Sequence, residues 1–160
     1  RLVSLLLANV ISISFDYFSR QKIGGLTMNF FIVKQLPVLS PESYKEKDIE
    51  FISRRVLKLT YSSMSMKEWA EELGYEGEPI EFNQAERARL QAELDAYFAK
   101  LYGLNRDELQ FILDPESIKP GYPSETFAVL KRSESRVYQE YRTQRLVLEA
   151  WDKLERGELH

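Results

Sequence analysis

The sequence predicts a mainly α-helical protein: several amphipathic helices in one helical domain, with a small β or extended element near residues 27–38. Apolar residues recur at spacings of three and four through most of the chain, which is the period of a helix with one buried face. Asn or Ser precedes several of these runs with Glu three positions later, as expected of helix starts. The 160 residues suffice to bury a core without disulfides, and the chain has no cysteine.

The first 41 residues form an apolar head. Residues 2–20 are expected to be a single helix, ending before Gly24-Gly25, a pair that predicts a tight turn. Residues 26–39 fit either a short strand or a helical turn, because periodicity alone does not separate the two. Residues 35–41 are expected to be extended, since residues before proline avoid the helical region.

The body, residues 42–160, is expected to form a helical domain whose helices are separated by loops. An apolar stripe of Ile49, Ile52, Val56 and Leu59 marks its first helix. Further helices are expected at residues 66–73, 84–102, 105–113, 125–132 and 134–156, with a proline-rich loop at 115–123.

The boundaries of these helices follow from local signals. Capping boxes are expected at the three pairs Ser65/Glu68, Asn83/Glu86 and Asn105/Glu108. Gly74 and Gly103 are expected to end the helices before them.

The composition excludes most familiar catalytic chemistries. The chain has no cysteine and its one histidine is His160, which excludes a Ser-His-Asp triad, a His-based acid/base pair, an HExxH zinc site and thiol catalysis. No phosphate-binding glycine motif is present, and the acidic run at residues 71–81 is typical of a solvated face rather than a metal site. We therefore expect no catalytic residues, no metal and no cofactor within the chain itself.

The apolar start of the chain raises the question of a membrane. Residues 2–18 are interrupted by Ser4, Asn9, Ser12 and Asp16, and a run this short is more typical of a buried helix than of a span or signal peptide. The chain starts at Arg1 inside this run, so we expect a fragment of a longer cytoplasmic protein that has no membrane partner.

Charge is unevenly distributed between head and body. The net charge of −3 is the sum of a head at +3 and a body at −6. In the head, Arg20, Gln21, Lys22, Asn29 and Lys34 are side chains of the types that contact phosphates and base edges. Cations at a helix end also complement the helix dipole, so that interpretation stays open.

The last helices carry a second basic group. Arg132, Arg136, Arg142 and Arg145 accompany Tyr138 and Tyr141, a composition suited to phosphate contact and stacking. Glu134, Glu140 and Glu149 interleave with these arginines, which favours a salt-bridged surface helix instead.

Two stretches resemble a known family. The first is residues 15–25 (FDYFSRQKIGG) and 29–38 (NFFIVKQLPV); the second is residues 94–109 (LDAYFAKLYGLNRDEL), 112–115, 125–127 and 140–151 (EYRTQRLVLEAW). Together they resemble the C-terminal region of the large adenine-specific DNA methyltransferases of bacterial restriction–modification systems, including the type IIG enzymes. The family often has Asn-Ser where this chain has Asn9-Val10.

The resemblance implies different roles for the two parts of the chain. Residues 1–41 would end a target-recognition domain, and residues 42–160 would form a helical C-terminal domain that packs on upstream domains of the same protein. The parent would bind S-adenosylmethionine and flip an adenine into an Asn/Asp-Pro-Pro-Tyr/Phe pocket, a motif that this chain lacks. DNA would be a partner through the parent, with or without nuclease activity. The alternative is a helical protein–protein interaction module without a nucleic-acid role.

Overall fold

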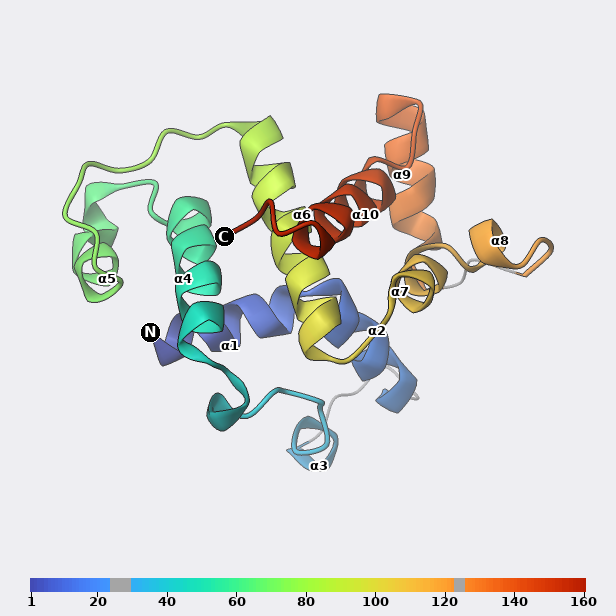
Figure 1. The fold of residues 1–160 in the computed structure, drawn as a ribbon, viewed down its shortest axis with the longest axis horizontal. Coiled ribbons are helices and arrows are strands. Elements are labelled where there is room, and N and C mark those ends of the chain that lie inside the picture. The colour runs from blue at the N-terminus through green and yellow to red at the C-terminus, as the bar shows by residue number, and fades with distance from the viewer. Residues whose placement is uncertain (24–29, 123–125) are drawn as a thin grey trace.

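The structure is a computed structural model that describes residues 1–23, 30–122 and 126–160 (Figure 1). These residues contain ten α-helices and no strand, which confirms the predicted helical class. The helices are α1 (Leu2–Ile11), α2 (Ile13–Lys22), α3 (Phe30–Val33), α4 (Glu46–Thr60), α5 (Lys67–Glu72), α6 (Gln84–Leu101), α7 (Arg106–Leu113), α8 (Pro115–Ile118), α9 (Ala128–Tyr138) and α10 (Arg142–Glu155). Short 3₁₀ helices lie at Pro41–Ser43 and Met64–Met66.

Helix α6 is the centre of the packing. It lies between α4 and α10, and α2 also packs against it (Figure 1). Leu94, Ala96, Phe98 and Ala99 of α6 are fully buried, because its neighbours enclose it from several sides.

Head and body share both large hydrophobic clusters. Leu5 and Ala8 of α1 pack with Phe51 of α4, whereas Ile13 of α2 packs with Leu109 of α7. In space α1 and α2 are therefore part of the helical core, and the division at residue 41 stays a prediction.

The expected single helix over residues 2–20 is wrong, because the chain bends by 66° between α1 and α2. Ser12 is extended at the bend, and its side chain accepts a hydrogen bond from Phe15 N at 3.3 Å. Asp95 of α6 accepts a second bond, from Ile13 N at 2.9 Å. Two otherwise unpaired amides at the start of α2 are thus satisfied, which stabilises a new helix start.

Residues 30–40 settle the choice that periodicity left open. Phe30–Val33 is a helical turn, α3, and residues 37–40 follow without regular structure. Residues 27–29 of the expected β or extended element lie outside the described residues, as does the turn expected at Gly24-Gly25.

The middle of the chain follows its boundary signals in part. Asn105 with Glu108 forms the expected capping box on α7, whereas at the expected box Asn83/Glu86 only the Asn83 side chain caps α6, by accepting from Glu86 N. The box expected at Ser65/Glu68 is wrong: Met66 precedes α5, and the Ser65 hydroxyl hydrogen-bonds to Ser63 Oγ at 2.7 Å. Ser65 lies within the 3₁₀ helix Met64–Met66 that precedes α5, so it does not occupy the N-cap position of α5.

The break between the last two helices lies further along the sequence than expected. We expected helices at residues 125–132 and 134–156 with a loop at 115–123, but the break lies at residues 139–141, and α8 occupies 115–118. Gln139 has a φ of 57°, which ends α9, and Glu134 of α9 accepts hydrogen bonds from Thr143 N and Oγ1, both at 2.7 Å. The Glu134 carboxylate thereby caps α10 from the preceding helix. Residues 123–125 lie outside the described part of the chain.

Within the described ranges, no single helix is long and apolar enough to cross a membrane; only α1 and α2 taken together reach that length, and they are bent.

Candidate nucleic-acid interface and docking face

The predicted DNA-contacting residues of the head lie on exposed surface. Arg20, Gln21 and Lys22 form the last turn of α2, and Lys34 directly follows α3. Asn29 lies outside the described residues. In Figure 1 the end of α2 and α3 both lie along the lower edge of the molecule.

Arg20 is partly neutralised within its own helix. Its Nε and Nη2 donate to the two carboxylate oxygens of Asp16 at 2.8 and 3.0 Å, one turn earlier. This bond raises the pKa of Arg20. A guanidinium held in this way still presents N–H groups to an anion, but its charge is shared with Asp16.

Lys22 and Lys34 are the freer cations of the head. Among the described residues neither has an ion-pair partner, and Lys34 Nζ lies 4.6 Å from the centre of the Phe30 ring. A charge held only by an aromatic face stays available to phosphate.

A buried hydrogen-bond junction positions the segment after α3. Asn9, fully buried on α1, donates from Nδ2 to Tyr102 Oη at 2.7 Å and accepts from Leu39 N at 2.8 Å. Tyr102 Oη in turn donates to the carbonyl oxygen of Pro37 at 2.6 Å. Asn9 thus ties the segment to α1 and to the end of α6 at once.

We expect Asn9→Ala to lower the free energy of unfolding by about 1–3 kcal/mol, because it leaves Leu39 N buried without an acceptor. Urea titration followed by circular dichroism measures the change. Gln21→Ala, which removes an exposed amide from α2, is the control and should change stability by less than about 0.5 kcal/mol. An Asn9→Ala protein as stable as this control would contradict the structural role of the junction.

Helix α1 carries apolar side chains on its outward side as well as on the side packed against the body. Its buried residues, Ser4, Leu5, Ala8 and Asn9, are half polar and half apolar. Its exposed residues are Leu2, Val3, Leu6, Val10 and Ile11, and Leu2 and Val3 retain 62% and 60% of their accessible surface. The outward side of an amphipathic surface helix is usually polar.

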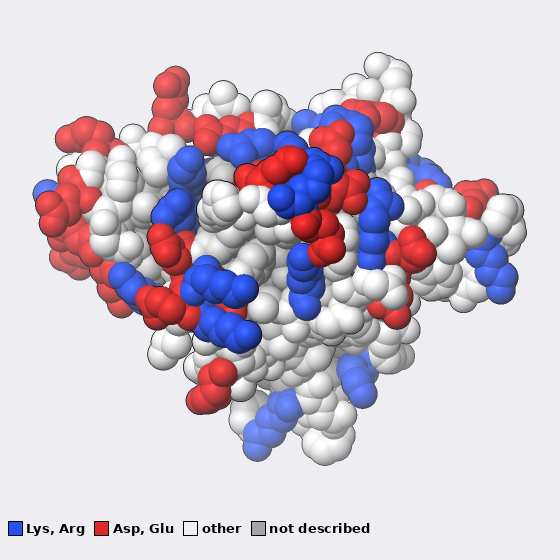
Figure 2. All heavy atoms as spheres, viewed as in Figure 1, with Lys and Arg blue, Asp and Glu red and all other residues white. Residues whose placement is uncertain are grey.

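Further exposed apolar side chains lie on α3 and in the segment that follows it. Phe30 and Phe31 are each 72% exposed, and Val33 and Val38 are also exposed. A shallow cavity of about 240 Å³ lies between α1 and the start of the body, lined by Leu2, Leu6, Val38 and their neighbours. In Figure 2 the lower edge of the molecule, where Figure 1 places α3, carries few charged side chains, whereas acidic side chains gather over α5 at the left. We call these apolar residues of α1, α3 and Val38 the head face.

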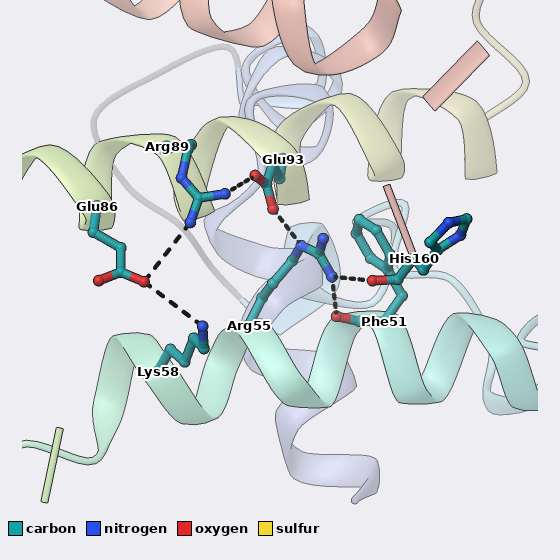
Figure 3. Close-up of polar contacts among 7 residues, drawn as sticks. All are labelled: Phe51, Arg55, Lys58, Glu86, Arg89, Glu93 and His160. Carbon is teal, nitrogen blue, oxygen red and sulfur yellow. Dashed lines mark hydrogen bonds and ion pairs between the residues drawn. The ribbon is translucent and has the colours of Figure 1, made fainter. Parts of the chain in front are cut away.

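A buried ion network joins α4 to α6 (Figure 3). Arg55 Nε donates to Glu93 Oε2 at 2.7 Å, and Arg89 Nη1 donates to Glu93 Oε1 at 2.6 Å. Arg55 Nη1 also donates to the carbonyl oxygens of Phe51 and His160 at 3.1 and 3.4 Å. Both oxygens of the Glu93 carboxylate are thus engaged within the protein, which identifies the network as structural.

The Arg55 guanidinium is also stacked. Its carbon lies 3.3 Å from the centre of the Phe51 ring, and Phe51 stacks on Tyr97 with centroids 4.0 Å apart. Tyr97 Oη donates to Asp48 Oδ1 at 2.6 Å. Burial, followed by the bond to Asp48, raises the pKa of Tyr97, so that this phenol stays protonated.

Among the described residues, no group of three or more His, Asp or Glu side chains could hold a metal ion. No family model, curated protein or solved structure matches the chain. The resemblance to DNA methyltransferases therefore stays a prediction, and the functional argument depends on the surface.

The sequence alone predicted that residues 2–18 form a helix packed inside a longer parent protein, but not which of its side chains form the head face. Its signal is the spacing of Ser4, Ala8, Asn9 and Ser12, small or polar residues that recur every three to four positions and mark the side turned toward the body.

Proposed function

We propose that the chain is the non-catalytic C-terminal segment of a restriction–modification adenine-specific DNA methyltransferase, and that it docks on the upstream domains of its parent through the head face. The observation that carries this proposal is the apolar outward side of α1. A helix that packs Leu5 and Ala8 on its own body and leaves Leu, Val and Ile exposed on the other side is suited to lie between two protein surfaces.

The physical argument is the hydrophobic effect. Burial of apolar surface contributes about 25 cal/mol per Å², and contiguous exposed patches of several hundred Å² are typical of interaction sites. The head face combines five exposed residues of α1 with Phe30, Phe31, Val33 and Val38. A parent domain that covers it would stabilise both partners.

DNA contact is the second part of the proposal. Lys22 and Lys34 would neutralise phosphates, Arg20 would do so while retaining Asp16, and Gln21 and Asn29 would read a base edge. In this proposal S-adenosylmethionine and the adenine pocket belong to upstream parts of a cytoplasmic parent.

One observation favours the second candidate, a helical interaction module without a nucleic-acid role. The body carries a charge of −6, and Arg20 is already paired with Asp16. An acidic body repels DNA unless its cations are concentrated on one face.

The test expresses the complete gene that encodes this chain in a host without adenine methyltransferases. We expect N6-methyladenine at one defined sequence of the host DNA. Leu6→Gln with Val10→Gln, which makes the head face polar at two exposed positions, should reduce this methylation at least about tenfold, because the tail no longer docks.

Phe82→Gln with Ile118→Gln is the matched control, since it removes two exposed apolar side chains outside the head face. Circular dichroism of each 160-residue variant establishes that it folds. Absence of adenine methylation would contradict the enzyme assignment, and methylation that is unchanged in the Leu6/Val10 variant would contradict the docking role.

A further inference from the structure

Helix α9 carries a basic outer surface. Arg132 and Arg136, one helical turn apart, are exposed together with Ser133 and Ser135. We call these four residues the α9 face. Among the described residues, neither arginine has a carboxylate partner; Arg132 Nε donates only to the carbonyl oxygen of Ala128 at 3.3 Å.

The acidic residues Glu134 and Glu140, which lie near these arginines in the sequence, form their contacts with other residues. Glu134 is buried and caps α10 through Thr143. Glu140 pairs with Arg145, whose Nε and Nη2 donate to it at 2.8 and 2.9 Å. The expected salt-bridged surface helix is therefore realised at Arg145 on α10 but not on α9.

Lys131, the remaining cation of α9, forms ion pairs with carboxylates outside this helix. Lys131 Nζ lies 2.7 Å from Asp114 Oδ2 and 3.5 Å from Glu116 Oε2, on the side that faces α7 and α8. These two carboxylates are thus engaged away from the α9 face. Within the described part of the chain, the two arginines of the α9 face are therefore left without an ion pair, on a chain whose body is acidic overall.

This arrangement is unfavourable without an anion. Like charges four residues apart on a helix destabilise it by about 0.2–0.5 kcal/mol, and no carboxylate among residues 1–23, 30–122 and 126–160 forms an ion pair with either arginine. The two arginines lie roughly 6 Å apart at their Cβ atoms. Two guanidiniums and two serine hydroxyls on one turn are donors of the kind that contact phosphate and sugar in protein–DNA complexes.

The position of α9 makes this surface accessible. The helix packs mainly on α10 and projects from the body at the upper right of Figure 1. Val129 and Val137 flank the α9 face, exposed by 72% and 57%. Two separated valines offer little apolar area compared with the head face, so charge decides the partner.

We propose that the α9 face binds the sugar–phosphate backbone of duplex DNA, as a contact separate from the head residues. The inference rests on the proposed role of the parent on DNA, but it uses none of the residues of α1, α2 or α3. Arg132 and Arg136 neutralise phosphates, and Ser133 or Ser135 donates a hydrogen bond to a phosphate oxygen.

The test measures binding of the 160-residue chain to a fluorescent duplex of about 25 base pairs by anisotropy, across a salt series. Loss of each phosphate contact lowers the slope of log K against log[salt] by about 0.9. For Arg132→Gln with Arg136→Gln we expect a slope lower by about 2 and an affinity reduced about tenfold at low salt.

Lys47→Gln with Arg54→Gln is the matched control, because it removes two exposed positive charges from α4. We expect its slope to change by less than about 0.5. Arg132→Lys with Arg136→Lys should keep most of the affinity, since lysine also neutralises phosphate.

Binding of the same proteins to phosphatidylserine vesicles is measured in parallel. Three results would overturn the inference. These are no duplex binding by the wild-type chain at low salt, equal losses of duplex affinity in the α9 and α4 variants, or an Arg132→Gln/Arg136→Gln variant that loses vesicle binding while its duplex binding is unchanged. The adenine-methylation test separates this failure from that of the proposed function. Methylation that depends on Leu6 and Val10 supports the parent assignment even when the α9 variant binds duplex normally.

Discussion

Replacing Arg55 with alanine is expected to lower the free energy of unfolding by about 3–5 kcal/mol, because it leaves the Glu93 carboxylate buried without its main partner. Arg55 and Glu93 are 6% and 3% exposed, and Nε of Arg55 donates directly to Glu93. The substitution also removes the stacking on Phe51 and the bond to the Phe51 carbonyl oxygen. Arg89 remains on Glu93, but its side chain is half-exposed and its charge is shared with Glu86.

The adjacent residue provides the control. Arg54 is exposed and pairs with Glu50 at 2.5 Å within α4, so Arg54→Ala should cost less than about 1 kcal/mol. Guanidinium titration of both variants measures the difference. Arg55→Met with Glu93→Leu should recover much of the loss, since it removes both buried charges. Equal stabilities of the Arg54 and Arg55 variants would contradict the role assigned to the network.

Replacing Asp95 with asparagine is expected to remove a large pH dependence of stability. Asp95 is buried on α6, and burial raises its pKa to about 7, although the hydrogen bonds from Ile13 N and Gln91 oppose that rise. None of the ion pairs among the described residues involves Asp95. Arg142 lines the same cavity of about 210 Å³, but its guanidinium lies 3.9 Å from the centre of the Tyr138 ring instead.

The direction in which stability changes with pH follows from the pKa values of the Asp95 carboxyl in the unfolded and folded states. In the unfolded chain it titrates near 3.9, and in the folded protein near 7. The folded state therefore holds the proton more tightly, and its stability contribution is fully present below about pH 4 and is lost as the pH rises to about 7. The slope is about 1.4 kcal/mol per pH unit across that window.

An asparagine side chain at this position would keep an acceptor for Ile13 N without a titrating group. The Asp95→Asn variant should match the wild type near pH 4 and exceed its stability by at most about 4 kcal/mol at pH 8. Thermal and urea unfolding from pH 4 to 8 measure the difference between the two proteins. Asp107→Asn, which removes an exposed carboxylate from α7, is the control. A constant difference for Asp95→Asn would show that Asp95 titrates normally.

The elements that sequence reasoning predicted well are those defined by nearby residues. Helix α6 was expected at residues 84–102 and lies at Gln84–Leu101, since Asn83 caps its start and Gly103, with a φ of 77°, follows its end. Both signals lie within two residues of the helix. Local hydrogen bonding and glycine geometry were sufficient there.

The elements predicted wrongly depend on distant residues. The break between α1 and α2 requires Asp95, which is 82 positions away from the amide that it accepts from. The break between α9 and α10 requires Glu134 to reach Thr143 across the turn. Neither contact is visible as a period or a capping box, so tertiary structure overrides the continuous helical pattern.

The candidate sites divide in the same way. Residue type and charge were sufficient to select Arg20, Lys22 and Lys34 as exposed cations, whereas the partner of Arg20 and the lack of a partner for Lys22 among the described residues required the structure. On α9 the sequence places Glu134 among the arginines, but only the fold shows that this carboxylate points inward. Which charges remain free on a surface is a property of side-chain direction rather than of composition.

The packing of α1 has a consequence for synthesis on the ribosome. The hydrogen bond from Ile13 N cannot form until Asp95, 82 residues later, has been synthesised, and α1 cannot pack until α4 has been synthesised. At about 5–20 residues per second, several seconds pass between the emergence of α1 and that of its partner on α6. During that interval both sides of α1 are uncovered, which makes it a target for chaperones that bind apolar segments. Its outward side stays exposed after the body has folded, so its Leu, Val and Ile side chains remain available for association with other apolar surfaces.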